Sequence, residues 1–252
     1  MTQWGAVVHG NPAYAILLAL TVVVAAWALW HSLTRRERRS GWRLVLRVIM
    51  LVLAVVWVGL MAWLRPFTAQ QTALAAMESD GNVIVSESAT QIVMTPTSDA
   101  SPLGVFFQPG AKVEARAYAA VLRPLAESGY TVVIPMQPLG IAFLSLGAFD
   151  KARPSYPGIS GWVVGGHSLG GTVAAMEADI SDSGSAGGAS RADLPAASAF
   201  TQIEGAVHAQ FGDYGPQPGD GVPTISDDDA RKQTSDAALT YLELLVPGLP
   251  QR

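Results

Sequence analysis

The first quarter of the chain contains two long apolar runs. Residues 13–30 contain no charged side chain, and residues 44–64 contain only Arg47, which lies near one end of its run. About 20 apolar residues in a helix span the hydrocarbon core of a bilayer, which is about 30 Å thick. The pattern therefore predicts two membrane-spanning helices, about 13–30 and 44–64, within a membrane anchor that covers residues 1–66.

The segment between the two runs predicts an orientation. It reads HSLTRRERRSGWR, and arginines in a short loop favour the cytoplasmic side. We therefore expect a two-pass protein of the cell membrane, with everything after Arg65 extracytoplasmic. A cleaved signal peptide is disfavoured because residues 1–12 lack a basic n-region. A buried helical hairpin in a soluble protein is the other alternative.

The rest of the chain has a different pattern. Residues 67–81 are small and polar and predict a short helical or flexible linker, and residues 82–252 then alternate strand and helix signals. We expect strands at 82–86, 91–95, 103–108, 130–136, 162–164 and 200–204, and helices at 115–128, 141–153, 169–179 and 226–245. The first two strands are expected to form an antiparallel pair at a sheet edge. This order predicts an α/β fold, with a mostly parallel sheet flanked by helices.

Composition and charge narrow the function classes. Half of the residues are hydrophobic and 14% are charged, which excludes a disordered chain. Residues 1–66 contain seven arginines and one glutamate, whereas the remainder contains nine basic and nineteen acidic residues. An acidic globular part argues against nucleic acid as a partner. The absence of cysteine excludes disulfides, thiolate metal ligands and a cysteine nucleophile, and we expect no metal site.

One motif indicates chemistry. Residues 165–171 read GGHSLGG and contain the pattern G-x-S-x-G around Ser168. The motif follows a predicted strand and opens a predicted helix, as a nucleophile elbow requires. The flanking residues must be small because strand and helix pass close to each other at such a turn. A phosphate-binding loop is disfavoured because the glycine spacing differs and no lysine follows.

A serine nucleophile needs a base and donors for the developing oxyanion. His9 and His31 belong to the anchor, and the His167 side chain should point away from the reacting atom. His208, the remaining histidine, is therefore the expected general base. The expected oxyanion donors are the backbone N–H of Leu169 and that of Gly110 or Ala111, in the loop after strand 103–108.

The elbow, residues 108–112 and residues 205–213 together resemble the α/β-hydrolase family, over about residues 83–245. The nearer resemblance is to the small esterase and lipase-like branch, to which dienelactone hydrolases are related. The resemblance implies an α/β sandwich, a Ser-acid-His triad and no cofactor. It also implies hydrolysis of an ester bond in a small-molecule or lipid-like substrate.

The chain departs from this family between the nucleophile and the base. Family members usually have strand–helix units with the acid in this interval. Here only 40 residues separate Ser168 from His208, and residues 180–199 show no strand pattern. We therefore expect at least one core strand to be missing. Asp182 is the first candidate for the acid. The alternatives are Asp179, Asp193 and the out-of-order Asp213.

Two functions follow from these patterns. The first is a membrane-anchored serine hydrolase that cleaves a carboxylic ester. The second is a catalytically impaired relative, without the acid strand, which acts as a membrane-bound binding or interaction protein. A peptidase or thioesterase with the same site is a third and weaker possibility.

Overall fold

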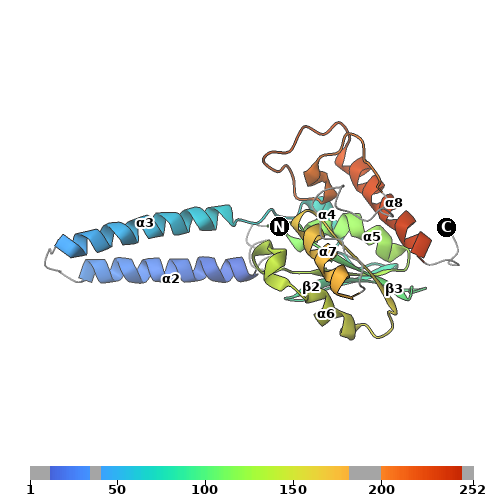
Figure 1. Cartoon of the computed structure of the whole chain (residues 1–252), viewed down its shortest axis with the longest axis horizontal. Helices are drawn as coiled ribbons and strands as arrows, with labels where there is room; N and C mark the ends of the chain where they lie inside the picture. Colours follow the sequence, from blue (N-terminus) through green and yellow to red (C-terminus); the bar gives the residue numbers. More distant parts are fainter. Residues whose placement is uncertain (1–11, 35–40, 182–199, 246–252) are drawn as a thin grey trace.

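The computed structural model describes residues 12–34, 41–181 and 200–245 (Figure 1). Helix α2 (Pro12–Thr34) and helix α3 (Gly41–Trp63) lie side by side and project from a globular part formed by the other described residues. This confirms the two long apolar helices expected from the sequence. Both are long and apolar enough to cross a membrane.

The two helices are joined to each other by side-chain hydrogen bonds. Tyr14 Oη donates to the carbonyl of Met61 at 2.9 Å, and Trp57 Nε1 donates to Thr21 Oγ1 at 2.9 Å. Nearly all of their apolar side chains are nevertheless exposed, so the globular part does not cover them. The pair is therefore not a buried core hairpin. Its apolar surface is of the kind that lipid covers.

Five strands form one mixed sheet. They are β1 (Val83–Glu87), β2 (Gln91–Pro96), β3 (Leu103–Gln108), β4 (Thr131–Pro135) and β5 (Gly161–Gly166). The spatial order is β1-β2-β4-β3-β5. Strand β2 is antiparallel to β1 and β4, while β3 is parallel to β4 and β5. Four strands therefore share one direction, which confirms the mostly parallel sheet and its antiparallel edge pair.

Helices cover both faces of this sheet. Helix α5 (Ala119–Glu127) and helix α8 (Asp227–Leu245) pack together on the face that contains Val105 and Val132. Helix α6 (Ala148–Ala152) packs against Phe106 and Val133 on the opposite face through Phe149. Ser226 caps α8, because its Oγ accepts the Asp229 N–H at 3.1 Å. The result is an α/β sandwich.

The segment between α3 and the sheet lies against the globular part. Phe67 forms a parallel bridge with Val113, and helix α4 (Gln71–Ala75) buries Ala73 completely. The Gln70 N–H donates to the Asp213 carbonyl at 2.8 Å. Residues 67–76 therefore join α3 to the loops around the sheet.

Two expectations for single elements were wrong. Residues 200–204 do not form a strand, and within the described residues the sheet ends at β5. A run of five residues becomes a strand only where a neighbouring strand pairs with it. Residues 141–153 do not form one helix, because they divide into the 3₁₀ turn η3 (Ala142–Ser145) and the short helix α6.

Candidate active site

Ser168 occupies the turn between β5 and helix α7 (Leu169–Ser181). Its φ is 53°, in the left-handed region that non-glycine residues rarely adopt, and its side chain is exposed. Such backbone strain is often found at functional sites. The sharp turn presents the serine hydroxyl to solvent at the carboxyl end of a parallel strand.

Glycines on both sides of Ser168 allow this turn. A Cβ on Gly166 would lie 2.5 Å from the carbonyl carbon of Gly170, and a Cβ on Gly170 would collide with the carbonyl oxygens of Gln108 and Pro109. By contrast, a Cβ on Gly165 would meet nothing within 4 Å. The first turn of α7 therefore lies directly against the end of β5 and the loop after β3.

Backbone hydrogen bonds hold the loop after β3 against the turn that contains Ser168. The His167 N–H donates to the Gln108 carbonyl at 3.1 Å. The Gly110 N–H donates to Tyr118 Oη at 2.9 Å, and the Lys112 N–H donates to the Gly140 carbonyl at 2.6 Å. Of the predicted loop donors, Gly110 is thus already engaged. This leaves the Ala111 N–H as the better candidate.

Three buried side chains, two amides and a carboxylate, are hydrogen-bonded in a row at the end of β3. Gln137 Nε2 donates to Gln108 Oε1, and Gln108 Nε2 donates to Glu177 Oε2, each at 2.6 Å. All three residues are buried. Since Gln108 points to the same face of β3 as Phe106, this contact also places α7 on the face covered by α6. These hydrogen bonds fix Gln108, whose carbonyl accepts the His167 N–H.

His167 points into the protein, as expected, while Ser168 is exposed. Tyr118 Oη lies 2.9 Å from His167 Nδ1 and is hydrogen-bonded to it. The ring also stacks on Phe211, with centroids 5.7 Å apart. Burial, and secondarily the neighbouring His208, lowers the pKa of His167 to about 4. His167 is therefore neutral at pH 7, and its Nε2 is buried without a hydrogen-bond partner among the described residues.

His208 begins a 3₁₀ turn, η6 (His208–Phe211), and its side chain is exposed. Its ring lies against that of His167, with centroids 4.4 Å apart. The turn is held by Asp220, whose Oδ2 accepts the Ala209 N–H at 2.7 Å. The structure thus brings His208 next to the residue that precedes Ser168, although 40 residues separate them in the chain.

The acid is the part of the predicted triad that the described residues do not supply. Asp182 and Asp193 lie outside the described residues, as does the side chain of Asp179. Both oxygens of Asp213 bind Arg231, at 2.5 and 3.1 Å. Among the described residues, no carboxylate is hydrogen-bonded to the His208 ring. Asp213 thus has a structural partner of its own.

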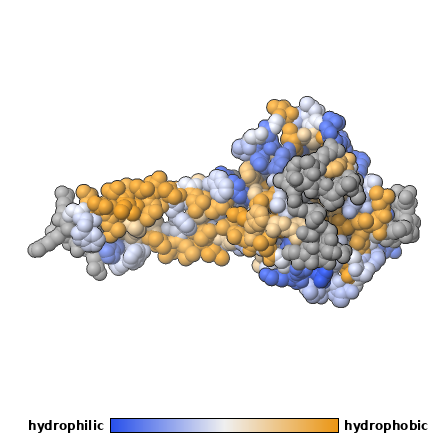
Figure 2. Space-filling model, viewed as in Figure 1, coloured by the Kyte–Doolittle hydropathy of each residue, from blue (hydrophilic) through white to orange (hydrophobic). Residues whose placement is uncertain are grey.

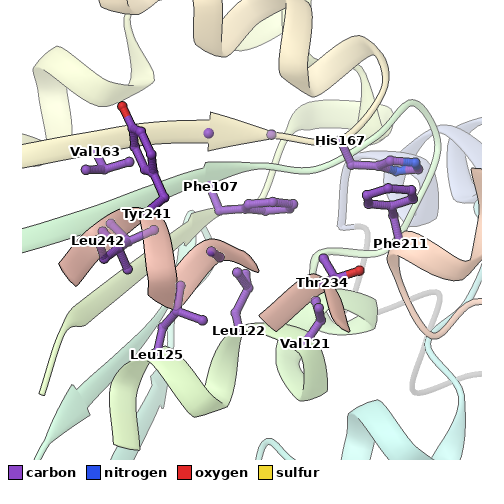
Figure 3. A pocket seen from close by; sticks show the side chains of 14 residues that line it. Phe107, Val121, Leu122, Leu125, Val163, His167, Phe211, Thr234, Tyr241 and Leu242 are labelled. Carbon is purple, nitrogen blue, oxygen red and sulfur yellow. The ribbon is translucent and has the colours of Figure 1, made fainter. Parts of the chain in front are cut away.

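An apolar pocket of about 170 Å³ lies behind the elbow, between β3, β5, α5 and α8 (Figure 3). His167 and Phe211 close one end of it, and Val163, Tyr241 and Leu242 line the other. Ser168 and His208 do not line this pocket. The pocket therefore does not include the exposed serine.

Comparison with known proteins adds one match. Residues 104–189 match the model of the alpha/beta hydrolase family. The matched segment runs from β3 through the elbow and α7. The sheet and its flanking helices are consistent with the α/β-hydrolase fold. No curated protein and no solved structure matches the chain significantly.

The sequence did not single out two residues that shape this site. Tyr118 joins Gly110 to His167, and Asp220 fixes the turn that begins at His208. Tyr118 lies 49 positions from His167, so no local pattern links them. No cluster of three metal-ligating side chains is found in the part of the chain that the structure describes.

Proposed function

We propose that the protein is a membrane-anchored serine hydrolase that cleaves a carboxylic-ester bond. One observation is central: Ser168 adopts a left-handed φ on a strand-to-helix turn whose flanking glycines leave no room for a side chain. This is the geometry that a nucleophile elbow needs. The alpha/beta hydrolase match over residues 104–189 supports the same class of reaction.

In this proposal Ser168 Oγ attacks the ester carbonyl carbon while His208 takes the hydroxyl proton. The Leu169 N–H, at the first position of α7, and the Ala111 N–H stabilise the oxyanion. Collapse of the intermediate breaks the ester C–O bond, and His208 returns the proton to the leaving alcohol. Water then attacks the acyl-enzyme with His208 again as base, which releases the acid and restores Ser168.

The neutral ring of His167 supports this role for His208. Two adjacent imidazolium ions would repel each other, so a neighbour that stays neutral allows His208 to take up the proton. Burial keeps His167 uncharged down to a pH of about 4. Tyr118 fixes the ring by its hydrogen bond to Nδ1. His167 thus acts as a positioning residue beside the base.

Anchoring in a membrane is part of the same proposal. Helices α2 and α3 are exposed and apolar over about 20 residues each. A signal sequence is the alternative for α2, which lies near the N-terminus, but α3 is a second run of the same kind. The arginine-rich segment between them favours the cytoplasm, which places the hydrolase domain outside it.

A catalytically impaired relative is the second candidate. It is favoured by the exposed His208 ring, to which no described carboxylate is hydrogen-bonded, and by a sheet that ends at β5 in the described residues. Loss of the acid from a triad reduces kcat by roughly 10⁴-fold. Such a protein would keep the turn at Ser168 but hydrolyse esters too slowly to act as an enzyme. It would act as a membrane-bound binding protein instead.

Hydrolysis of p-nitrophenyl butyrate by the full-length protein in detergent separates the two. An enzyme releases p-nitrophenol, and Ser168→Ala and His208→Ala each lower the rate at least about 10³-fold. Ser128→Ala, an exposed serine at the end of α5, is the matched control and keeps the full rate. A wild-type rate equal to that of Ser168→Ala favours the impaired relative and rejects the hydrolase.

A further inference from the structure

The base of the helical hairpin is attached to the carboxyl end of the sheet. Tyr14, Met61 and Leu64 form a buried apolar cluster, against which Leu139 and Ile141 pack from the loop after β4. Lys112, in the loop after β3, donates from Nζ to the Trp63 carbonyl at 2.9 Å and lies over the Trp63 ring. The hairpin therefore meets the globular part at the loops after β3 and β4.

These two loops are locked to each other. A Cβ on Gly140 would lie 2.8 Å from Lys112 Cα, and the Lys112 N–H donates to the Gly140 carbonyl. Leu139 and Lys112 both adopt a left-handed φ, of 57° and 59°. This tight packing fixes the orientation of the carboxyl end of the sheet relative to the hairpin.

The candidate active site lies at the same carboxyl end of the sheet. Strands β3, β4 and β5 are parallel, so the loops that follow them lie along the same end of the sheet. Ser168 follows β5 directly. The serine and the hairpin base are therefore at the same end of the molecule, whereas Ser160, which precedes β5, is at the opposite end.

The loop after β4 continues into an exposed apolar surface. Phe143, Leu144 and Leu146 are 44%, 55% and 48% exposed, in and just after the 3₁₀ turn η3 (Ala142–Ser145). Helix α7 packs against this turn, and its Met176 is 40% exposed. Figure 2 shows the apolar surface of the hairpin continuing onto the adjacent side of the globular part. Contiguous exposed apolar surface of this kind marks an interaction site.

We propose that residues 141–146 form a membrane-contact loop that holds the Ser168 end of the sheet against the bilayer, and that the substrate is an acyl ester of the lipid class drawn from that leaflet. The inference rests on the proposed membrane anchor and ester hydrolysis. Trp63, an exposed tryptophan at the end of α3, is of the type found at headgroup level, and Lys112 touches it. The bilayer is therefore the occupant of this surface.

The absence of cysteine allows a direct test with the full chain. Leu144→Cys and Ser160→Cys, each labelled with an environment-sensitive fluorophore, are reconstituted into phosphatidylcholine vesicles with and without spin-labelled lipid. We expect the label at 144 to be quenched by the lipid spin label at least about threefold more than the label at 160, because quenching needs contact. Equal quenching at the two positions overturns the membrane-contact loop, whether or not the protein is an enzyme.

The substrate class is tested separately. The variant Phe143→Ser/Leu144→Ser/Leu146→Ser loses apolar contact with the bilayer but leaves the catalytic residues unchanged. We expect it to hydrolyse a phospholipid-type ester in vesicles about tenfold more slowly than wild type, and p-nitrophenyl butyrate at the same rate. Equal rates on the vesicle substrate overturn the inference. Absence of hydrolysis on both esters by wild type rejects the proposed function instead.

Discussion

Single residues at the site have environments that define their roles. Ser168 is exposed and has an unfavourable backbone conformation, whereas its neighbour His167 is buried and hydrogen-bonded. His208 is exposed beside His167. The two histidines therefore differ in exposure, and the proposed mechanism assigns the proton transfer to the exposed His208.

Acid should destabilise the fold through His167. Its pKa is about 4 in the folded state and about 6.5 when exposed, so the unfolded chain binds the proton more readily. This contribution to stability is complete above pH 6.5 and is lost as the pH falls toward 4. The loss is on the order of 3 kcal/mol. Chemical denaturation of the detergent-solubilised protein at pH 7 and pH 4 measures it.

His167→Asn provides the comparison for this prediction, because asparagine keeps an acceptor for Tyr118 but does not titrate. We expect the variant to lose less stability than wild type between pH 7 and pH 4. His208→Asn, which removes the exposed ring, should lose about as much as wild type. An identical pH dependence in wild type and His167→Asn would show that His167 is not the group that titrates.

Asp213 should act in folding and not as the acid of the triad. Both of its oxygens bind Arg231, and the carboxylate is buried. Removing one partner of a buried ion pair costs about 3–5 kcal/mol when the other charge is left unpaired. Arg231 also binds the exposed Asp228, so the cost of losing Asp213 should lie toward the lower end of this range. We expect Asp213→Asn to lower the free energy of unfolding by a similar order, while the folded fraction keeps its rate of ester hydrolysis per molecule. A stable but inactive variant would assign Asp213 to catalysis.

At the scale of elements, the sequence was informative where the pattern was strong. The strands expected at 82–86, 91–95 and 130–136 and the helix expected at 226–245 lie within about two residues of the observed bounds of β1, β2, β4 and α8. The expectation for residues 200–204 was wrong because so short a run does not determine whether a partner strand exists. Tyr118 and Asp220 were not predictable, since their roles depend on contacts between distant segments.

The turn between β5 and α7 should tolerate a methyl group at one glycine and not at its neighbour. A Cβ on Gly166 would collide with the backbone at Gly170, whereas a Cβ on Gly165 has open space. We expect Gly166→Ala to destabilise the protein by about 1–3 kcal/mol and to lower ester hydrolysis. Gly165→Ala is the matched control, with stability and rate near wild type. Equal behaviour of the two variants in thermal melting and activity would contradict the elbow packing.

In the whole molecule, the base of the helical hairpin meets the sheet at the end where Ser168 lies. The apolar helices are joined to the loops after β3 and β4, and the candidate nucleophile follows the adjacent parallel strand. The sequence predicted the two helices and the elbow separately. It could not predict that they meet at one end of the molecule, because this follows from contacts between segments far apart in the chain, such as Lys112 with Trp63, 49 positions away.

The proposed orientation of the chain in the membrane rests on the arginines around residues 35–43. In sealed right-side-out vesicles we expect an impermeant maleimide to label Ser128→Cys in the globular part but not Ser40→Cys between the helices. Detergent permeabilisation should make Ser40→Cys reactive. Labelling of Ser40→Cys alone in intact vesicles would reverse the topology.

The central claim is that Ser168 is a nucleophile, and the position of a covalent adduct tests it most directly. The full-length protein in detergent is treated with a fluorophosphonate, digested, and analysed by mass spectrometry. We expect one adduct on the peptide that contains Ser168, formed by wild type and by Ser128→Ala and absent from Ser168→Ala. A wild-type protein that remains unmodified, or that is modified equally after Ser168→Ala, would contradict it.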